Sequence, residues 1–553
     1  MSAEATRGAH RGRKGAALLL GAVVYALLYA LCSPIDRGGH GAAEGFWLRF
    51  VPAFGVALPV LFALFRWGMP HLAFDGARGG RRYFALRVFG LLAACYGAMF
   101  LIQYPGSFMY DTQRQVFQIA RGDYEMFHPL LHTLLIRLCL SAYGVLQSFE
   151  KCAALYSVIQ LAVMAACFAQ VCASLDRMAG RRAAWIAALF FALHPSHMAF
   201  ASNCTKDGLF SAFFALFFAL CLEEMTTGAL AAPRRVLRLA AGVLACLLRN
   251  NMIYALAVWM ILALLGGRRG LRLAACALLS MAAALGINGA MGRALDAREA
   301  SIVEMFSVPI QQLARARLEA PECFTPQEQT LMDEVFVDAL YGDPAPLYTR
   351  YEPTLADPVK NYLDEDLVRA RLPELARLWA GVGMRCPDVY LDAFLSLALP
   401  SLYPYSQYRV AQPYIETGLQ PGVVTAPFGQ PPMTQPARFA PIRTWMAEHI
   451  YLTGADDVPL LRWLLNTGFV FWVLLMALLD AIYEGQGRRL LALLLPALLW
   501  GTYLLGPVMQ GRYLYPFLCV LPLFLLRRKA EEREGAYEKN QAIHAKEDIN
   551  HGI

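Results

Sequence analysis

Charged residues are scarce in this sequence. Only 16% of its 553 residues are Asp, Glu, Lys or Arg, whereas 58% are apolar. Soluble domains carry about 25% charged residues. Uninterrupted apolar runs of roughly 17 to 25 residues, the length of a transmembrane helix, recur along the chain. The composition therefore excludes an ordinary soluble protein and predicts an all-α polytopic membrane protein.

Three further features are absent from the sequence: metal-site cysteine spacings, internal repeats and a signal-peptide cleavage site. The 13 Cys include no CxxC pair and no other spacing typical of a metal site. Most of them lie inside apolar runs, but Cys323 and Cys386 share the one large hydrophilic segment, so a disulfide between them stays open. No internal repeat is evident. No A-x-A site follows the first apolar run, residues 15–32, so we interpret this run as a span and not as a signal peptide.

The net charge of +7 does not indicate a nucleic-acid partner. The basic residues form short clusters between apolar runs, where the orientation of a membrane protein requires them. No nucleic acid is expected among the partners, and membrane lipids are.

About twelve transmembrane helices are expected. They lie near residues 15–32, 47–65, 88–104, 152–173, 183–200, 207–222, 236–249, 251–266, 272–290, 459–481, 490–506 and 513–526. A thirteenth apolar stretch, 129–145, carries His132 and Arg137 in its middle. If it lies along the membrane surface, the clusters of Lys and Arg all fall on the side of the basic amino terminus. We therefore predict an interfacial helix here and two cytoplasmic termini.

This topology divides the chain into five segments. They are a basic amino terminus with two leading spans (1–83), a transmembrane module with an outward loop at 105–151 (84–290), an outward-facing, mainly helical segment (291–458), three carboxyl-terminal spans (459–526) and a charged, disordered cytoplasmic tail (527–553).

The outward segment carries its own helix signals. Thr325-Pro326-Gln327-Glu328 reads as a capping box and predicts a helix over 326–340. Helical patterns also suit 299–318 and 365–380. Nine prolines fall between Pro400 and Pro441, which excludes regular helix or central strand there. This Pro-rich stretch, 400–441, is either an ordered flap over the membrane face or a flexible connector.

Asp111 is the first candidate for chemistry. It opens a polar helical stretch just beyond a span, and Gly122 ends that stretch. Its structural role would be an N-cap, which Asp fills well. Its functional role would be that of a general base that takes a proton from an attacking hydroxyl. The two roles do not exclude each other.

His128 and His132 are four residues apart, with Pro129 as a first helical residue, so both imidazoles should project from one face of the interfacial helix. Two His and one carboxylate are a weak metal signal. Hydrogen bonding to substrate phosphate or sugar hydroxyls suits them better, with interfacial packing as the alternative. No metal or other cofactor is required as far as the residues show.

Cations occupy three further outward turns. Arg249-Asn250 interrupts an otherwise continuous apolar stretch, Lys206-Asp207 starts the span before it, and Arg512-Tyr513 starts the last span. An Arg at the edge of an apolar bundle is costly unless it faces a cavity or a partner, and guanidinium binds phosphate bidentately. Lys206, Arg249, Asn250, Arg512 and Tyr513 are therefore candidate substrate-binding residues. Ordinary snorkelling of the cations and a Lys206–Asp207 ion pair are the alternatives.

A family resemblance adds to this reading. The span, the outward Asp, the surface helix that begins at a Pro and the short cationic turns resemble the GT-C class of integral-membrane glycosyltransferases. Pieces of the chain also resemble a bacterial family of multispan proteins of that design, over roughly Phe84 to Leu526. Those pieces are Asp111 to Gln113, His128 to Thr133, Ser307 to Gln312, Asp357 to Lys360 and Arg512 to Pro516.

The resemblance implies a function. In GT-C enzymes the first-loop Asp is the catalytic base and the donor is a polyprenyl-phosphate or polyprenyl-diphosphate sugar, which assigns the base role to Asp111. Some members carry two adjacent acids here, but Thr112 follows Asp111, which argues against a metal-dependent mechanism. The expectation is an inverting glycosyltransferase at the outer face of a bacterial cytoplasmic membrane, acting on an extracytoplasmic acceptor. A lipid or polysaccharide translocase and a non-catalytic membrane scaffold are the alternatives.

Overall fold

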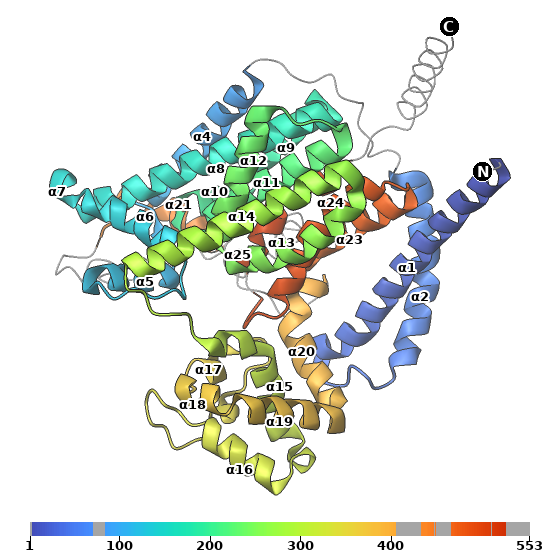
Figure 1. Ribbon diagram of the computed structural model, residues 1–553, viewed down its shortest axis with the longest axis vertical. Helices are drawn as coiled ribbons and strands as arrows, with labels where there is room; N and C mark the ends of the chain where they lie inside the picture. The colour runs from blue at the N-terminus through green and yellow to red at the C-terminus, as the bar shows by residue number, and fades with distance from the viewer. Residues whose placement is uncertain are drawn as a thin grey trace.

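Helices make up most of the described residues, and the only sheet among them has two short strands. The computed structural model describes residues 3–69, 83–404, 433–446, 448, 466–509 and 511–526. Figure 1 shows a large helical bundle with a smaller helical lobe below it. The expectation of an all-α, multi-pass membrane protein is confirmed.

The bundle consists of long apolar helices from both halves of the chain. They are α1 (Ala3–Gly38), α2 (Phe46–Ala63) with the π-helix η1 (Leu64–Gly68), α4 (Phe84–Gln103), α8 (Phe149–Ala179), α9 (Arg181–Leu193), α10 (Pro195–Ser202), α11 (Lys206–Thr227), α12 (Ala232–Leu248), α13 (Asn250–Ala263) with the 3-10 turn η2 (Leu264–Gly266), α14 (Gly267–Ala294), α23 (Thr467–Tyr483), α24 (Gly487–Tyr503) and α25 (Gly511–Phe524). A helix thus covers each expected span, although the residues before Thr467 in the tenth are not all described.

Six helices in the described part are long and apolar enough to cross a membrane, or up to seven if the bent pair of α9 and α10 is one span. Helices α12, α23, α24 and α25 have at most 17 residues in their described lengths. The expected number of twelve spans therefore stays a prediction. Helix α11 lies at the centre: nearly all of its residues are buried, and Phe210, Phe214 and Phe218 line up along one side of it.

The two ends of the bundle differ in charge. Helix α11 has 22 residues and, at about 1.5 Å per residue, is about 33 Å long. Lys206 opens it, close to Asp111, and we call this the Asp111 end. Glu223 and Glu224 lie in its last turns and pair with Arg177, Arg234, Arg238 and Arg272, so we call this the basic end.

The stretch between α4 and α8 stays at the Asp111 end. It contains α5 (Tyr110–Arg121), α6 (Leu130–Ser141) and α7 (Tyr143–Leu146). Helices α6 and α7 together form an apolar segment, Leu130–Leu146, that is shorter than the helices long enough to cross a membrane. The Ser157 hydroxyl, in the first turns of α8, donates to the Pro105 carbonyl just after α4. This bond joins the two ends of the stretch. Figure 1 shows α5, α6 and α7 grouped at one side of the bundle, and the surface helix expected here stays a prediction.

The smaller lobe has a separate core. Its elements are η3 (Ile302–Phe306), α15 (Ser307–Glu319), η4 (Pro321–Cys323), α16 (Pro326–Val335), η5 (Leu347–Arg350), α17 (Asp357–Lys360), α18 (Glu365–Ala370), α19 (Leu372–Arg385) and α20 (Pro387–Leu402). The capping box of Thr325 and Glu328 is confirmed. Its helix ends at Val335 and not near 340, because Phe336 leaves helical geometry and packs into the lobe core.

The motifs of the lobe hold it together. Gln311 donates to the Glu352 carbonyl, Gln312 joins Tyr390 to Trp379, and Lys360 pairs with Glu304 and Asp357. The lobe is also tied to the bundle beside Arg512. The Ala356 amide donates to the Pro507 carbonyl at 2.8 Å, and Leu355 bridges to Val508. The lobe therefore fixes the loop that leads into α25.

Helix α1 packs against α2, α20 and α23, and Figure 1 shows α1 and α2 together at one side of the molecule. Asp392 accepts hydrogen bonds from the amides of Gly41 and Ala42 in the turn between α1 and α2. Arg315 donates to the Gly39 carbonyl. At the other end of α1, Lys14 lies 4.8 Å from the centre of the Tyr483 ring. Two cytoplasmic termini remain a prediction.

Two expectations fall largely outside the described residues. One is the Pro-rich stretch, of which only the two ends are described: Pro400 to Leu402 belong to α20, and η7 (Ala437–Phe439) and α21 (Ala440–Met446) lie at its far end. The other is the tail from residue 527 onward. Cys323 and Cys386 are both free thiols, and Cys386 donates to the Val382 carbonyl. The disulfide between them stays an open prediction.

Candidate functional site

The chain reaches Asp111 through a tight turn at the end of α4. Tyr104–Pro105 is a cis peptide, and Gly106 has φ +123°. A Cβ on Gly106 would lie 2.2 Å from the Ser157 hydroxyl, so only glycine fits here. The next residues form β1 (Ser107–Phe108), which pairs in parallel with β2 (Asn203–Cys204) just before Lys206. This pairing brings two loops that are far apart in sequence to the same place.

Asp111 does not cap its helix. Helix α5 begins at Tyr110 with Met109 at the N-cap, and no side chain caps it. The cap interpretation of Asp111 is therefore wrong, because the carboxylate is engaged elsewhere. Its Oδ2 accepts from Lys206 Nζ at 2.9 Å and from Arg512 Nη1 at 2.8 Å. The expected end of the helix at Gly122 is confirmed, with φ 70°.

Burial gives these ion pairs their strength. The side chains of Asp111, Lys206 and Arg512 are 11%, 13% and 4% exposed. Charge interactions strengthen where water is excluded. Burial alone would raise the pKa of Asp111, but Lys206 and Arg512 outweigh it and hold the pKa well below its usual range. Asp111 is therefore a fixed anion in this arrangement.

His128 completes this set of residues, which we call the Asp111 cluster: Asp111, His128, Lys206 and Arg512. Its Nδ1 lies 3.4 Å from Lys206 Nζ, and only 1% of the residue is exposed. Burial first, and then the charge of Lys206, lower the pKa of His128 to about 3. Because an ammonium only donates, Nδ1 is the acceptor and Nε2 carries the proton. That Nε2 is buried without a hydrogen-bond partner among the described residues.

Arg249 is held by a second acid. Its Nε donates to Asp207 Oδ1 at 2.8 Å, and its Nη2 donates to the same oxygen. The expected Lys206–Asp207 ion pair is therefore not formed: Lys206 pairs with Asp111, and Asp207 pairs with Arg249. From the sequence, Asp207 is noticed only as a neighbour of Lys206. The feature that could have identified it is an acid at the start of an apolar span, where a charge needs a partner.

Tyr513 links the two Arg residues. The guanidinium carbon of Arg249 and that of Arg512 each lie 4.7 Å from the centre of its ring. Arg512 also donates to the Tyr513 hydroxyl at 2.9 Å, and Tyr503 stacks on the ring. Cation–π contacts of this kind are strengthened by burial. The structure thus brings Arg249 next to the Asp111 cluster through an aromatic ring, not through Asp111 itself.

His132 faces a different set of partners. Its Nδ1 lies 2.8 Å from Gln115 Oε1, and its Nε2 lies 2.7 Å from the Tyr156 hydroxyl. Tyr156 continues to Gln160, which donates to the Asn203 carbonyl at the start of β2. His128 precedes α6, whose N-cap is Pro129. The expectation that both imidazoles project from one face of this helix is therefore wrong, because His128 lies outside it and has different partners. The His132 network supports the β1–β2 turn from behind.

Two expected residues are less informative. Asn250 is exposed at the first position of α13, while its neighbour Asn251 donates to Thr502. The structure does not place Asn250 in the cluster. As for metal, no three His, Cys, Asp or Glu side chains come together among the residues described here.

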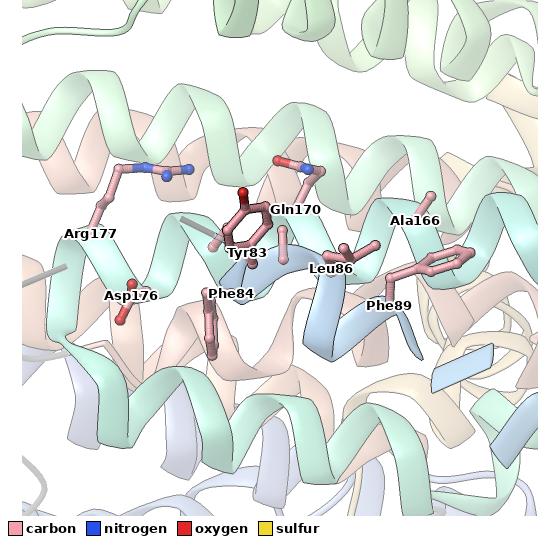
Figure 2. Close-up of a pocket in the computed structure, with 11 residues that line it drawn as sticks. Tyr83, Phe84, Leu86, Phe89, Ala166, Gln170, Asp176 and Arg177 are labelled. Carbon is pink, nitrogen blue, oxygen red and sulfur yellow. The ribbon is translucent and has the colours of Figure 1, made fainter. Parts of the chain in front are cut away.

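A groove of about 500 Å³ lies elsewhere, between α4 and α8. Figure 2 shows its lining, which includes Tyr83, Gln170, Asp176 and Arg177. Arg177 pairs with Glu223, so its charge is already neutralised at the basic end. No residue of the Asp111 cluster lines this groove, and it does not mark the same site.

The fold and the cluster define a class: a multi-pass α-helical membrane protein with a buried, cation-rich cluster at one end of its bundle. Residues 126–542 match a family described as a family of unknown function (DUF6020). This is more than half of the chain, so the chain belongs to that family. The matched range includes His128, Lys206, Arg249 and Arg512 but begins after Asp111. No curated protein and no solved structure matches the sequence.

Proposed function

We propose that this protein is an inverting glycosyltransferase that uses a polyprenyl-phosphate sugar at the outer face of the bacterial cytoplasmic membrane. One observation carries the proposal: a carboxylate and two cations share a buried site where a membrane bundle ends. The chemistry needs a base for the acceptor and positive charge for a departing lipid phosphate. Asp111, Lys206 and Arg512 supply both.

The reaction follows from these roles. The acceptor hydroxyl attacks the anomeric carbon, its proton passes to Asp111, and the bond from that carbon to the lipid phosphate oxygen breaks. The transition state resembles an oxocarbenium ion, as in glycoside hydrolysis. Lys206 and Arg512 stabilise the negative charge on the leaving phosphate. Tyr513 and the Asp207–Arg249 pair hold Arg512 in position, and the neutral His128 Nε2–H is a further donor beside Lys206.

The membrane side follows the distribution of basic residues. The basic end carries Arg177, Arg181, Arg234, Arg238 and Arg272, which favours the cytoplasm. The Asp111 end then faces outward together with the lobe. A pair of cysteines tests this in a Cys323→Ser background: Glu299→Cys in intact cells should react with a membrane-impermeant maleimide, and Arg182→Cys should not. The reverse pattern would remove the outward active face.

A transfer assay tests the function itself. Purified full-length protein in lipid nanodiscs is incubated with a panel of polyprenyl-phosphate sugars labelled in the sugar. Release of the label to water or to an added acceptor is expected for wild type and not for Asp111→Asn. Asp176→Asn is the matched control, because Asp176 is equally buried but pairs with Arg181 at the basic end. Undiminished release by Asp111→Asn would remove the base assignment.

One observation favours the translocase alternative. Helices α9 and α10 are bent by 58° at Pro195, and broken helices are common in transporters. The break is, however, filled by the protein itself: the Tyr96 hydroxyl donates to the Phe191 carbonyl, and His197 bonds to the Tyr515 hydroxyl at 2.9 Å. Scrambling of labelled polyprenyl phosphate in liposomes, without sugar transfer, would support translocation.

A further inference from the structure

Among the described residues, three cations, Lys206, Arg249 and Arg512, lie near two carboxylates, Asp111 and Asp207. Arg249 donates twice to one oxygen of Asp207. Lys206 and Arg512 both contact Asp111, and they do so at the same atom, Oδ2.

Cations bind a phosphate oxygen with the same distances with which Lys206 and Arg512 bind the Asp111 carboxylate. An oxygen that accepts from a guanidinium at 2.8 Å and from an ammonium at 2.9 Å has the distances of a charge-assisted bond to a phosphate oxygen. Lys206 has three donors, of which Asp111 and His128 engage two. The third donor of Lys206 has no partner among the described residues, so a second anion can contact Lys206 while Asp111 is still bound to it.

The same contacts conflict with a base at Asp111. A general base works best when its pKa lies near the working pH, whereas the two cations hold the pKa of Asp111 low. Two explanations are open to this conflict. Either Asp111 is a permanent counter-ion of Lys206 and Arg512, or it leaves them when substrate binds.

We propose that the Asp111 carboxylate occupies the position in which a ligand phosphate binds. A phosphate ester displaces the carboxylate from Lys206 and Arg512 and thereby frees it to accept a proton. This rests on the proposed function for the identity of the ester, a polyprenyl phosphate headgroup. The exchange leaves no cation unpaired, because the phosphate replaces the carboxylate as their partner. Base activity then arises only when the donor is bound.

The exchange makes an unusual prediction. An internal carboxylate that competes with the ligand weakens its binding, so a neutral residue at position 111 should tighten it. Binding of polyprenyl phosphate, with no sugar and no acceptor present, is measured by microscale thermophoresis on full-length protein in nanodiscs. Asp111→Asn should lower the Kd at least tenfold relative to wild type. Asp111→Glu, which keeps the competing charge, should not.

Controls separate the exchange from other causes. Asp111→Ser is made in parallel, so that the test does not depend on the folding of one variant, and the Tm of each variant is recorded. Asp176→Asn removes an acid from the basic end and should leave the Kd unchanged. A second arm replaces the lipid with inorganic phosphate. A lower Kd for the lipid assigns the phosphate position to a lipid headgroup. A lower Kd for inorganic phosphate alone assigns it to a soluble phosphate ester.

The outcome that overturns the inference is equally clear. If neutral variants with a wild-type Tm bind both phosphates as weakly as wild type or more weakly, Asp111 is a permanent counter-ion. Because this measurement involves no turnover, a protein that shows the exchange but transfers no sugar would refute only the proposed function.

Discussion

The two ends of the bundle both contain buried ion pairs, but they use them differently. At the basic end, Glu223 and Glu224 each have two Arg partners, one more buried (Arg234 at 16% and Arg238 at 4% exposed) and one partly exposed (Arg177 at 32% and Arg272 at 47%). Water can screen the charges of the two exposed partners. At the Asp111 end, two cations converge on one carboxylate oxygen, and none of the three side chains is more than 13% exposed.

This contrast separates a structural set of ion pairs from a candidate binding site. At the basic end each acid has two Arg partners of its own, and one partner of each acid is partly exposed. At the Asp111 end, two cations that are shielded from water share a single acid, and we infer that they can bind a further anion. Both kinds look alike as Lys, Arg, Asp and Glu in a sequence.

The largest expected effect comes from Asp111→Asn. Loss of a general base lowers the rate by about 10²- to 10⁴-fold. The labelled-sugar assay measures it, with Asp176→Asn at the basic end close to wild type. Equal losses in the two variants would mean that the two ends do not differ in function.

Arg512→Gln is expected to be nearly as severe. Removal of one donor that stabilises developing charge costs about 10²- to 10³-fold in kcat. The matched change is Arg234→Gln, which also breaks a buried pair, with Glu223 at 2.6 Å, but at the basic end. Rates at saturating donor should fall for Arg512→Gln and hold for Arg234→Gln. Similar rates for the two variants would contradict a role of Arg512 in leaving-group stabilisation.

Arg249→Gln should act on stability first. It leaves Asp207 buried without its partner, which costs about 3 to 5 kcal/mol in comparable pairs. Arg177→Gln removes a partly exposed partner of Glu223 and should cost at most about 1 kcal/mol. Thermal unfolding in nanodiscs compares them. The double variant Asp207→Asn/Arg249→Gln should recover part of the loss, and no recovery would show that Arg249 acts on something other than Asp207.

The smallest effect concerns pH. Burial, followed by the charge of Lys206, lowers the pKa of His128 to about 3, against about 6.5 in an unfolded chain. Between these values the unfolded chain binds a proton that the folded protein does not. Stability should therefore fall as pH drops below about 6.5. His128→Asn should flatten the decrease in Tm between pH 7.5 and 5, whereas His40→Asn, at an exposed position, should not.

Much of the fold was readable from the sequence. Apolar run length locates the long helices of the bundle, and the capping box of Thr325 and Glu328 with Pro326 locates the start of α16 in the lobe. Helix α20 was not predicted, and the Pro-rich stretch expected to be irregular begins at Pro400, which lies inside this helix. Pro387 stands in its first turn, where its missing N–H costs nothing.

The candidate site was readable only in part. Asp111, Lys206 and Arg512 were each predicted from their place at the ends of spans, and the structure brings them together. Their partners were not predictable, because the parallel β1–β2 pairing that sets Lys206 against Asp111 joins loops about ninety residues apart. Nothing in local sequence distinguishes a Lys206–Asp207 pair from the observed exchange of partners. Gln115, Tyr156 and Gln160 were missed, although a Gln within an apolar span is itself a signal of a buried network.

The most direct measurement is an experimental structure of the full-length protein with a polyprenyl phosphate bound in nanodiscs. The account predicts phosphate density between Lys206 and Arg512, with the Asp111 carboxylate no longer in contact with either. Phosphate bound at another place in the protein, with Asp111 still held by both cations, would contradict it.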